Sequence, residues 1–312
     1  RRTGLVRTWT GRIRRLPDLA AKNTSVRQFA ERAATNTPIQ GGSADVIKVA
    51  ATADIHADLE SQLPPGEMER FVASVFAEAP DVFIVAGDIA GLGARARTPF
   101  LRSFDGLAAA KLVVPGNHDL WLPEGDSWAQ YAALRDEFAD AGWHMLDGAP
   151  RIFGNVAIVG SAGWYDHTLA DPGLELPPDS DYGAKRWCGR VIWNDGVFVR
   201  LGRTDQAFCA ELLRRLEQDI ESVEARVDTI VAVTHVIGFE EMLTSKPDDP
   251  TWTFCNAYMG STELGALLLR HPKISYHLCG HTHEARVVRK GHLTSINIGS
   301  TYARKRLEVL SV

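Results

Sequence analysis

Residues 111–119 read KLVVPGNHD, and the pattern of this stretch indicates the fold class. The apolar run 112–114 has the length and β-branched character of a short buried strand. A Pro-Gly pair ends the strand, and three polar residues follow at once: Asn117, His118 and Asp119. In open α/β sheets, ligands bind outside the carboxyl ends of the strands. The stretch therefore predicts an α/β fold with its chemistry at one edge of a sheet.

Four more apolar runs end in the same way, over residues 46–53, 82–86, 230–233 and 275–279. They lead into Asp54-Ile55-His56, Gly87-Asp88, Thr234-His235 and Gly280-His281-Thr282-His283. Because the carboxyl ends of parallel strands meet at the same edge, we expect all these polar side chains to converge in one cleft.

The segments between these runs alternate in hydrophobic period. Helical spacing predicts helices over 66–79, 128–141, 205–224 and 262–270, and further apolar runs predict strands over 156–160, 295–298 and 307–312. Strands alternating with helices indicate a layered α/β sandwich with both sheet faces covered. Residues 168–200 are rich in Asp, Gly, Pro and Trp, which predicts an irregular surface insertion.

Composition excludes several classes of protein. The chain has 312 residues, of which 45% are hydrophobic and 23% charged, so it is neither disordered, nor collagen, nor a coiled-coil rod. No run of 18 apolar residues and no apolar stretch behind the basic N-terminus exists, so neither a membrane span nor a secretory signal is expected. The four cysteines are widely spaced, which argues against a disulfide framework and a zinc finger and favours a cytoplasmic setting.

The residue types after the strands suit a pair of metal ions. His, Asp and Asn offer nitrogen and oxygen ligands without sulfur, which fits divalent or trivalent ions such as Mn, Fe or Zn. Asp-x-His and His-x-His place two side chains on one side of an extended segment. Two ions ~3.5–4 Å apart form a clamp for in-line displacement at phosphorus.

The order D-x-H, G-D, G-N-H-D, H and G-H-x-H, over about residues 46–312, resembles the calcineurin-like metallophosphoesterase superfamily. The resemblance implies a four-layer α/β/β/α sandwich that hydrolyses a phosphomonoester or phosphodiester by attack of a metal-bridging hydroxide. It implies the following roles: Asp54, His56 and His283 on the first metal; Asn117, His235 and His281 on the second; Asp88 bridging both; His118 contacting a phosphate oxygen or protonating the leaving group; and Asp119 orienting His118.

One departure concerns the second motif, which in this family often continues as G-D-x-x-D/N. Here the last position is Gly91, so the bridging Asp88 is intact while a further polar contact is missing. Substrate identity is left open, because function lies in the loops around the site. Those loops are residues 161–200 and 240–259. Within or beside them, His167, Trp187, Trp193, Trp252, Arg186, Arg190 and Arg200 are candidates for either substrate contact or plain structural roles.

The N-terminal segment has a different character. Residues 1–50 hold ten Lys/Arg and three Asp/Glu, whereas the rest of the chain is acidic. Residues 4–50 resemble a palm-region fragment of family A DNA polymerases, which implies that Arg32, Asn36 and Gln40 match residues lining the primer–template minor groove. Nothing here matches the catalytic carboxylates, fingers or thumb, so we predict no polymerase activity. The alternative function is a nucleic-acid-binding or DNA-end-processing protein that uses this basic arm.

The two resemblances compete for the junction. The polymerase pattern predicts a helix over residues 44–50, whereas the phosphoesterase pattern requires a strand over about 47–53. A central strand buries far more apolar area than an orphan surface helix, so we predict the strand. The domain organisation is then a short basic appendage over 1–45 and a metallophosphoesterase domain over 46–312. Oligomeric state is not predicted.

Overall fold

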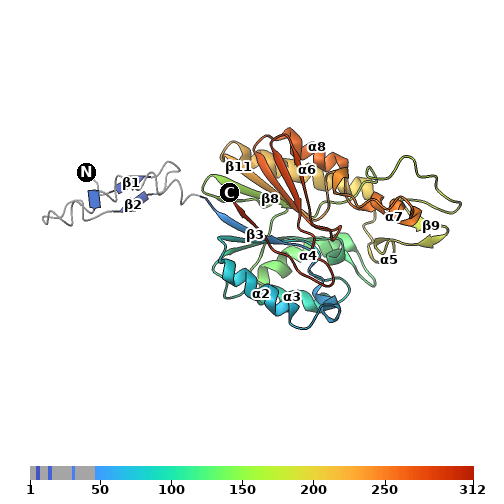
Figure 1. Ribbon diagram of the computed structural model, residues 1–312, viewed down its shortest axis with the longest axis horizontal. Helices are drawn as coiled ribbons and strands as arrows, with labels where there is room; N and C mark the ends of the chain where they lie inside the picture. The colour runs from blue at the N-terminus through green and yellow to red at the C-terminus, as the bar shows by residue number, and fades with distance from the viewer. Residues whose placement is uncertain (1–4, 8–12, 16–29, 32–45) are drawn as a thin grey trace.

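The structure is a computed structural model that describes residues 5–7, 13–15, 30–31 and 46–312 (Figure 1). The part from residue 46 onward contains two β-sheets and a set of helices, which confirms the predicted α/β fold class. Every strand and helix predicted above is present, with bounds that agree to within two residues.

The first sheet has five strands in the order β15-β3-β4-β5-β6. These strands are Glu308–Ser311, Lys48–Thr52, Val82–Ala86, Ala110–Val114 and His144–Met145. All pair in parallel except β15, which runs antiparallel to β3. Strand β3 spans the disputed junction, so the strand prediction is confirmed and the helical alternative is wrong. Its residues 49–52 are buried, as the argument from apolar area requires.

The second sheet has six strands in the order β13-β14-β12-β11-β8-β7. These strands are Arg286–Lys290, Leu293–Asn297, Ile274–Cys279, Thr229–Thr234, Val156–Ser161 and Arg151–Phe153. The four central strands are parallel, and the two edge strands are antiparallel. The short edge strands β6, β7 and β13 were not predicted.

The order of the layers follows from the sheet face on which each strand side chain lies. Val49 and Ala51 pack against residues of the second sheet such as Val231, whereas Ala50 faces the opposite way, toward helices. Helices α2 (Glu67–Glu78), α3 (Arg97–Arg102) and α4 (Ser127–Asp140) cover the first sheet; α6 (Asp205–Glu224) and α8 (Thr262–Arg270) cover the second (Figure 1). The layers therefore follow the order helices, first sheet, second sheet, helices.

The insertion after β8 is irregular, as predicted. It carries only the two-residue strands β9 (Arg186–Trp187) and β10 (Arg190–Val191) and the single turn α5 (Asp195–Phe198). Helix α7 (Pro250–Cys255) lies beside it at the end of the molecule shown on the right of Figure 1. Trp187 and Phe254 hold the two segments together with ring centroids 5.2 Å apart. Trp187 therefore has a packing role.

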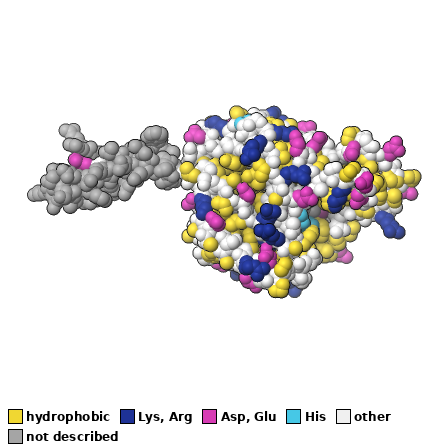
Figure 2. Space-filling view, viewed as in Figure 1, with side chains coloured by type: hydrophobic (Ala, Val, Ile, Leu, Met, Phe, Trp, Pro, Cys, Tyr) yellow, Lys and Arg dark blue, Asp and Glu magenta, His cyan; other side chains and the backbone are white. Residues whose placement is uncertain are grey.

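Within residues 1–45, the described part includes strand β1 (Leu5–Arg7), which pairs antiparallel with β2 (Ile13–Arg15). Arg32, Asn36 and Gln40 lie outside the described residues. No helix among the described residues is long and apolar enough to cross a membrane. All four cysteines are free thiols, and the cytoplasmic setting inferred from them stays a prediction. On the face visible in Figure 2, basic and acidic side chains are interspersed over residues 46–312.

Candidate metal centre

The polar residues that follow the strands sit on sharply turned backbone. Five of them have left-handed φ values: Asp54 (54°), His56 (46°), Asp88 (54°), His281 (72°) and His283 (60°). This region costs most residues conformational energy, although Asp and His enter it more readily than others. Such backbone strain gathers at functional sites, where the surrounding structure holds it in place.

Two glycines allow the loops to approach one another. A Cβ on Gly280 would lie 2.6 Å from Asp54 Oδ2, and one on Gly116 would collide with the Asp88 side chain and backbone. Real Cβ atoms do not come this close to other atoms, so only glycine lets the third and fifth motifs lie against the first two.

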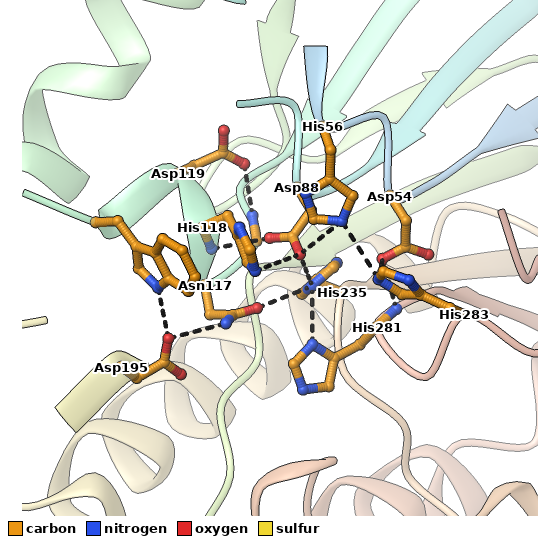
Figure 3. A network of polar contacts seen from close by, with 12 residues as sticks. Asp54, His56, Asp88, Asn117, His118, Asp119, Asp195, His235, His281 and His283 are labelled. Atoms are coloured by element: carbon orange, nitrogen blue, oxygen red, sulfur yellow. Dashed lines mark hydrogen bonds and ion pairs between the residues drawn. The ribbon is translucent and has the colours of Figure 1, made fainter. Parts of the chain in front are cut away.

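One group of donors comes from the first, second and fifth motifs. Ligand atoms of Asp54, His56, Asp88 and His283 all lie within 4.8 Å of one another (Figure 3). His56 Nε2 is 3.3 Å from His283 Nε2 and 3.7 Å from Asp88 Oδ2. His283 Nε2 is 3.6 Å from Asp54 Oδ1. Four potential ligands therefore face a common point.

A second group lies on the other side of Asp88. Ligand atoms of Asp88, His235 and His281 also lie within 4.8 Å of one another. His235 Nε2 is 3.2 Å from Asp88 Oδ2, 3.1 Å from His281 Nδ1 and 3.2 Å from Asn117 Oδ1. The seven residues expected at the metals thus converge, and Asp88 belongs to both groups.

The outer ring nitrogens of this second group are occupied by backbone. His235 Nδ1 donates to the carbonyl oxygen of Ala86 at 2.9 Å, and His281 Nε2 donates to that of Tyr258 at 3.0 Å. Each ring therefore turns its other nitrogen inward. Metal-ligating histidines usually donate their second N–H to a carbonyl or carboxylate in this way, which fixes the tautomer.

The donors fit a cation on electrostatic grounds as well. Asp54 Oδ2 is buried and has no hydrogen-bond partner among the described residues, and burial raises the pKa of that carboxyl group. Burial lowers the pKa of His56 to about 2 and that of His281 to about 3, so both rings are neutral and have lone pairs to offer. Two buried carboxylates beside neutral imidazoles are a chemically suitable cage for a divalent ion.

His235 differs from the other rings. Burial works against its charged form, but the adjacent Asp88 carboxylate outweighs burial and raises the pKa of His235 to about 9. The same contact holds the pKa of Asp88 well below its usual range, despite burial. Ligation requires the neutral ring, so metal uptake here is expected to release a proton.

Asp195, in the insertion, was missed by sequence reasoning. It is buried and accepts four hydrogen bonds. Oδ1 accepts from Asn117 Nδ2 at 2.9 Å and Trp121 Nε1 at 2.6 Å; Oδ2 accepts from Tyr165 Oη and Trp193 Nε1, each at 2.9 Å. Because Asp195 holds the Asn117 NH₂ group, the Oδ1 atom of Asn117 faces His235 Nε2 (Figure 3).

We expect Asp195→Asn to weaken metal binding by roughly 10–100-fold, the effect typical of losing a group that orients a ligand. Each carboxylate oxygen accepts two of the four bonds, so the new NH₂ group would face two donors. Where this NH₂ group replaces Oδ1, the bond to Asn117 is lost and Asn117 is free to turn over. Metal titration by calorimetry measures the change. Asp171→Asn, an exposed site in the same insertion, is the matched control. Equal affinities in both variants would contradict the positioning role.

His118 lies at the edge of both groups. Its ring stacks on Trp121 with centroids 3.7 Å apart, and its Nε2 is 3.9 Å from Asp88 Oδ2. Its backbone N–H donates to Asp88 Oδ1 at 2.9 Å. The ring borders the cleft beside the donor groups, so it can reach a ligand bound there.

Asp119 faces away from that ring. Its carboxylate accepts from the backbone N–H groups of Gly116, Ile89 and Ala90 and from Arg97 Nε at 3.1 Å. Among the contacts of the described residues, none joins it to the His118 ring. The predicted orienting role therefore has no support in these contacts. Asp119 instead ties the second and third motif loops together, with buried Arg97 as its counter-ion.

Gly91 stands where the family often has an acidic or amide residue, and an acidic side chain from another loop lies close to it. A Cβ at Gly91 would lie 3.3 Å from both His118 Nδ1 and Asp58 Oδ2. Asp58 follows His56 by two residues, and its Oδ2 accepts from Gly93 N at 3.2 Å. A carboxylate therefore lies close to Gly91, although it comes from the loop after the first motif and not from the second motif.

The remaining candidates for substrate contact fall into two groups, those that line the cleft and those that lie outside it. Trp193 and Trp252 line the cleft, together with Tyr302, which was not predicted. His167 lies outside it, beside Asp205 and Gln206. The three arginines do not line the cleft: Arg186 and Arg190 are exposed on β9 and β10, and Arg200 donates to the carbonyl oxygens of Leu122, Pro123 and Val197.

Known proteins resemble the chain in two separate stretches. The profile of the family A DNA polymerases matches residues 1–75. DNA polymerase I of Mycobacterium bovis is 41% identical over 91 residues, covering 24% of this chain and 10% of the polymerase. That of Lactococcus lactis subsp. cremoris is 53% identical over 47 residues, covering 15% of this chain and 5% of the polymerase. The chain thus spans a tenth or less of these polymerases, so their activity does not transfer.

The second stretch covers the sandwich. In fold, the chain is similar to phosphopantetheinyl hydrolase from Mycobacterium tuberculosis, with a TM-score of 0.65, 19% identity, and coverage of 84% of this chain and 95% of that one. A dimetal phosphatase from Danio rerio follows, with a TM-score of 0.50, 13% identity, and coverage of 82% and 88%. The profile of the calcineurin-like phosphoesterases matches residues 47–285, and the chain belongs to that family.

Proposed function

We propose that residues 46–312 form a domain that hydrolyses a phosphomonoester or phosphodiester with the aid of two metal ions. The observation that carries this proposal is the convergence of two donor groups that share Asp88. Asp54, His56 and His283 would hold one ion, Asn117, His235 and His281 the other, and Asp88 both. Nitrogen and oxygen donors without sulfur favour Mn, Fe or Zn.

When bound, such ions supply Lewis-acid polarisation of a phosphoryl oxygen and acidify water. The chain's own residues do the rest. Asp195 holds the Asn117 amide in its ligating orientation through the bond to Nδ2. His118, fixed by its stack on Trp121, is placed to donate a proton to the leaving-group oxygen or to a phosphate oxygen. Buried Lys305 donates to the carbonyl oxygen of Asp54 at 2.8 Å and adds positive charge beneath the first group.

The decisive experiment is an activity screen over phosphomonoesters and phosphodiesters. Purified protein is stripped of metal and then supplied with Mn, Fe or Zn. The proposal expects turnover that appears only with metal. Metal-loaded protein that hydrolyses no ester in the screen, or chelator-treated protein that keeps full activity, would contradict it.

Metal should also stabilise the fold, because the ions bind the native state alone. At a free metal concentration 100 times Kd, each occupied site should raise the free energy of unfolding by about 2.7 kcal/mol. Thermal unfolding with and without Mn or Zn measures this as a rise in Tm. His281→Ala should lose the share of the rise that comes from the second ion, whereas His292→Ala, at an exposed position, should keep the whole rise. An equal rise in both variants would show that metal binds elsewhere.

A second candidate function is nucleic-acid contact through residues 1–45, favoured by the polymerase match and the basic composition. It predicts affinity for duplex DNA that falls steeply with salt, as counterion release requires. Deleting residues 1–44 should remove this affinity and leave ester hydrolysis intact. Hydrolysis lost together with folding would overturn the proposed division at residue 45.

A further inference from the structure

The donor groups open into a cleft of about 350 Å³, large enough for a small organic group. One wall is the candidate metal centre. A second wall comes from the insertion and from residues 244–259, here called the α7 segment, and its large side chains are Ile192, Trp193, Trp252 and Met259. Tyr302 borders the metal side, with its ring 4.8 Å from those of His56 and His283. A bound ester would therefore place its phosphate on one wall and its organic group on the other.

The tryptophans present carbon to the cleft. Trp193 Nε1 donates to Asp195 at 2.9 Å, and Trp252 Nε1 donates to the carbonyl oxygen of Thr244 at 2.8 Å. Since both indole N–H groups are already bonded within the protein, neither needs a polar ligand. Trp193 is also held by its stack on Tyr258, with centroids 5.4 Å apart. Hydrogen bonds thus hold both indole rings, and the surface that these rings offer to the cleft is apolar.

Cationic side chains are missing from this wall. Among the described residues, those lining the cleft include no Lys or Arg. The polar lining residues beyond the metal side are neutral, namely Thr244 and Asn256. Lys246 lies 3.3 Å from the Trp252 ring centroid but does not line the cleft. A second anionic group would therefore lose its water without gaining a counter-ion, which is costly.

Building on the proposed phosphoesterase function, we propose that this cleft selects phosphate esters whose organic group is uncharged and apolar, of the alkyl or aryl kind. It discriminates against esters with a further anionic group, polyphosphates and nucleic-acid strands included. The insertion and the α7 segment, rather than the family motifs, set this preference.

The test compares three phosphonates that the enzyme cannot hydrolyse. They are methylphosphonate, benzylphosphonate and 4-carboxybenzylphosphonate, and their affinities for the metal-loaded protein are measured by calorimetry. Benzylphosphonate should bind roughly tenfold more tightly than methylphosphonate, because its ring is buried against the tryptophans. The carboxylated ring should lose that gain. Equal binding of all three, or tightest binding of the carboxylated compound, would overturn the proposal.

Two variants test whether the gain in benzylphosphonate affinity comes from the wall formed by the insertion and the α7 segment. Trp252→Ala and Met259→Ala should each reduce the benzyl-over-methyl ratio. Trp128→Ala removes a half-buried tryptophan of α4 outside the cleft and should leave the ratio intact. An unchanged ratio in both cleft variants would overturn the proposal. Failure of the phosphoesterase function has a different signature: no ester is turned over, although the order of phosphonate affinities holds.

Discussion

Asp88→Asn is expected to abolish turnover, with a loss of at least about 10³-fold. Metal assistance contributes several kcal/mol to such reactions, and each 1.36 kcal/mol is a factor of ten. Asp88 faces both donor groups, so losing its charge affects both ions. The side chain is nearly isosteric, and its remaining oxygen can still accept the His118 N–H, so the fold should persist.

The measurement is kcat on the best ester from the screen, together with metal content by mass spectrometry. Asp105→Asn is the matched control, because Asp105 is exposed and belongs to neither donor group. We expect the control to behave as wild type and Asp88→Asn to bind fewer than two ions. If Asp88→Asn kept wild-type activity, the bridging role would be wrong.

His118→Ala is expected to lower kcat by roughly 10²–10⁴-fold, the usual contribution of a general acid. Metal content should stay near two ions, because His118 lies beside the donor groups without belonging to either. The loss should be smaller for esters with very acidic leaving groups, since these depart without a proton.

Leaving-group dependence separates this role from its alternative. The comparison uses a series of aryl esters with leaving groups of graded acidity, measured on wild type and His118→Ala. Equal losses across the series would point to stabilisation of charge on phosphate oxygens instead of proton donation. His144→Ala is a useful control, because that ring bonds to the carbonyl oxygen of Ala149, away from the cleft. A His118 variant that also lost its metal would contradict the separation of roles.

Much of the fold could be predicted because its signals are local. A buried strand is a run of apolar residues, and a parallel sheet gathers the residues that follow its strands at one edge. Asp54, Asp88, Asn117 and His235 each follow such a strand, so their convergence could be predicted from the sequence. The strand at the junction was predicted for a related reason, because burial of residues 49–52 outweighs a nearly balanced local propensity.

Other parts of the site had no local signal. Asp195 reaches Asn117 across 78 residues of sequence, from an insertion that reads only as irregular. Asp58 lies near His118 because two loops meet at Gly91. The glycine at position 91 had suggested that a polar contact of the second motif was missing. Asp119 stands next to His118 in sequence, and this adjacency suggested an orienting role. Its side chain instead turns toward Arg97 and three backbone N–H groups.

Strand period and motif order are properties of the chain, so they already indicate which donors this protein has and at which edge of the sheets these donors lie. The division of the donors into two groups around Asp88, and the nitrogen that each ring turns inward, follow from the packed fold. It also decided that Trp193 and Trp252 form the apolar wall. Side-chain direction depends on packing and on hydrogen bonds between segments that are far apart in sequence. It also depends on left-handed turns such as the one at His281, and no local sequence pattern encodes these.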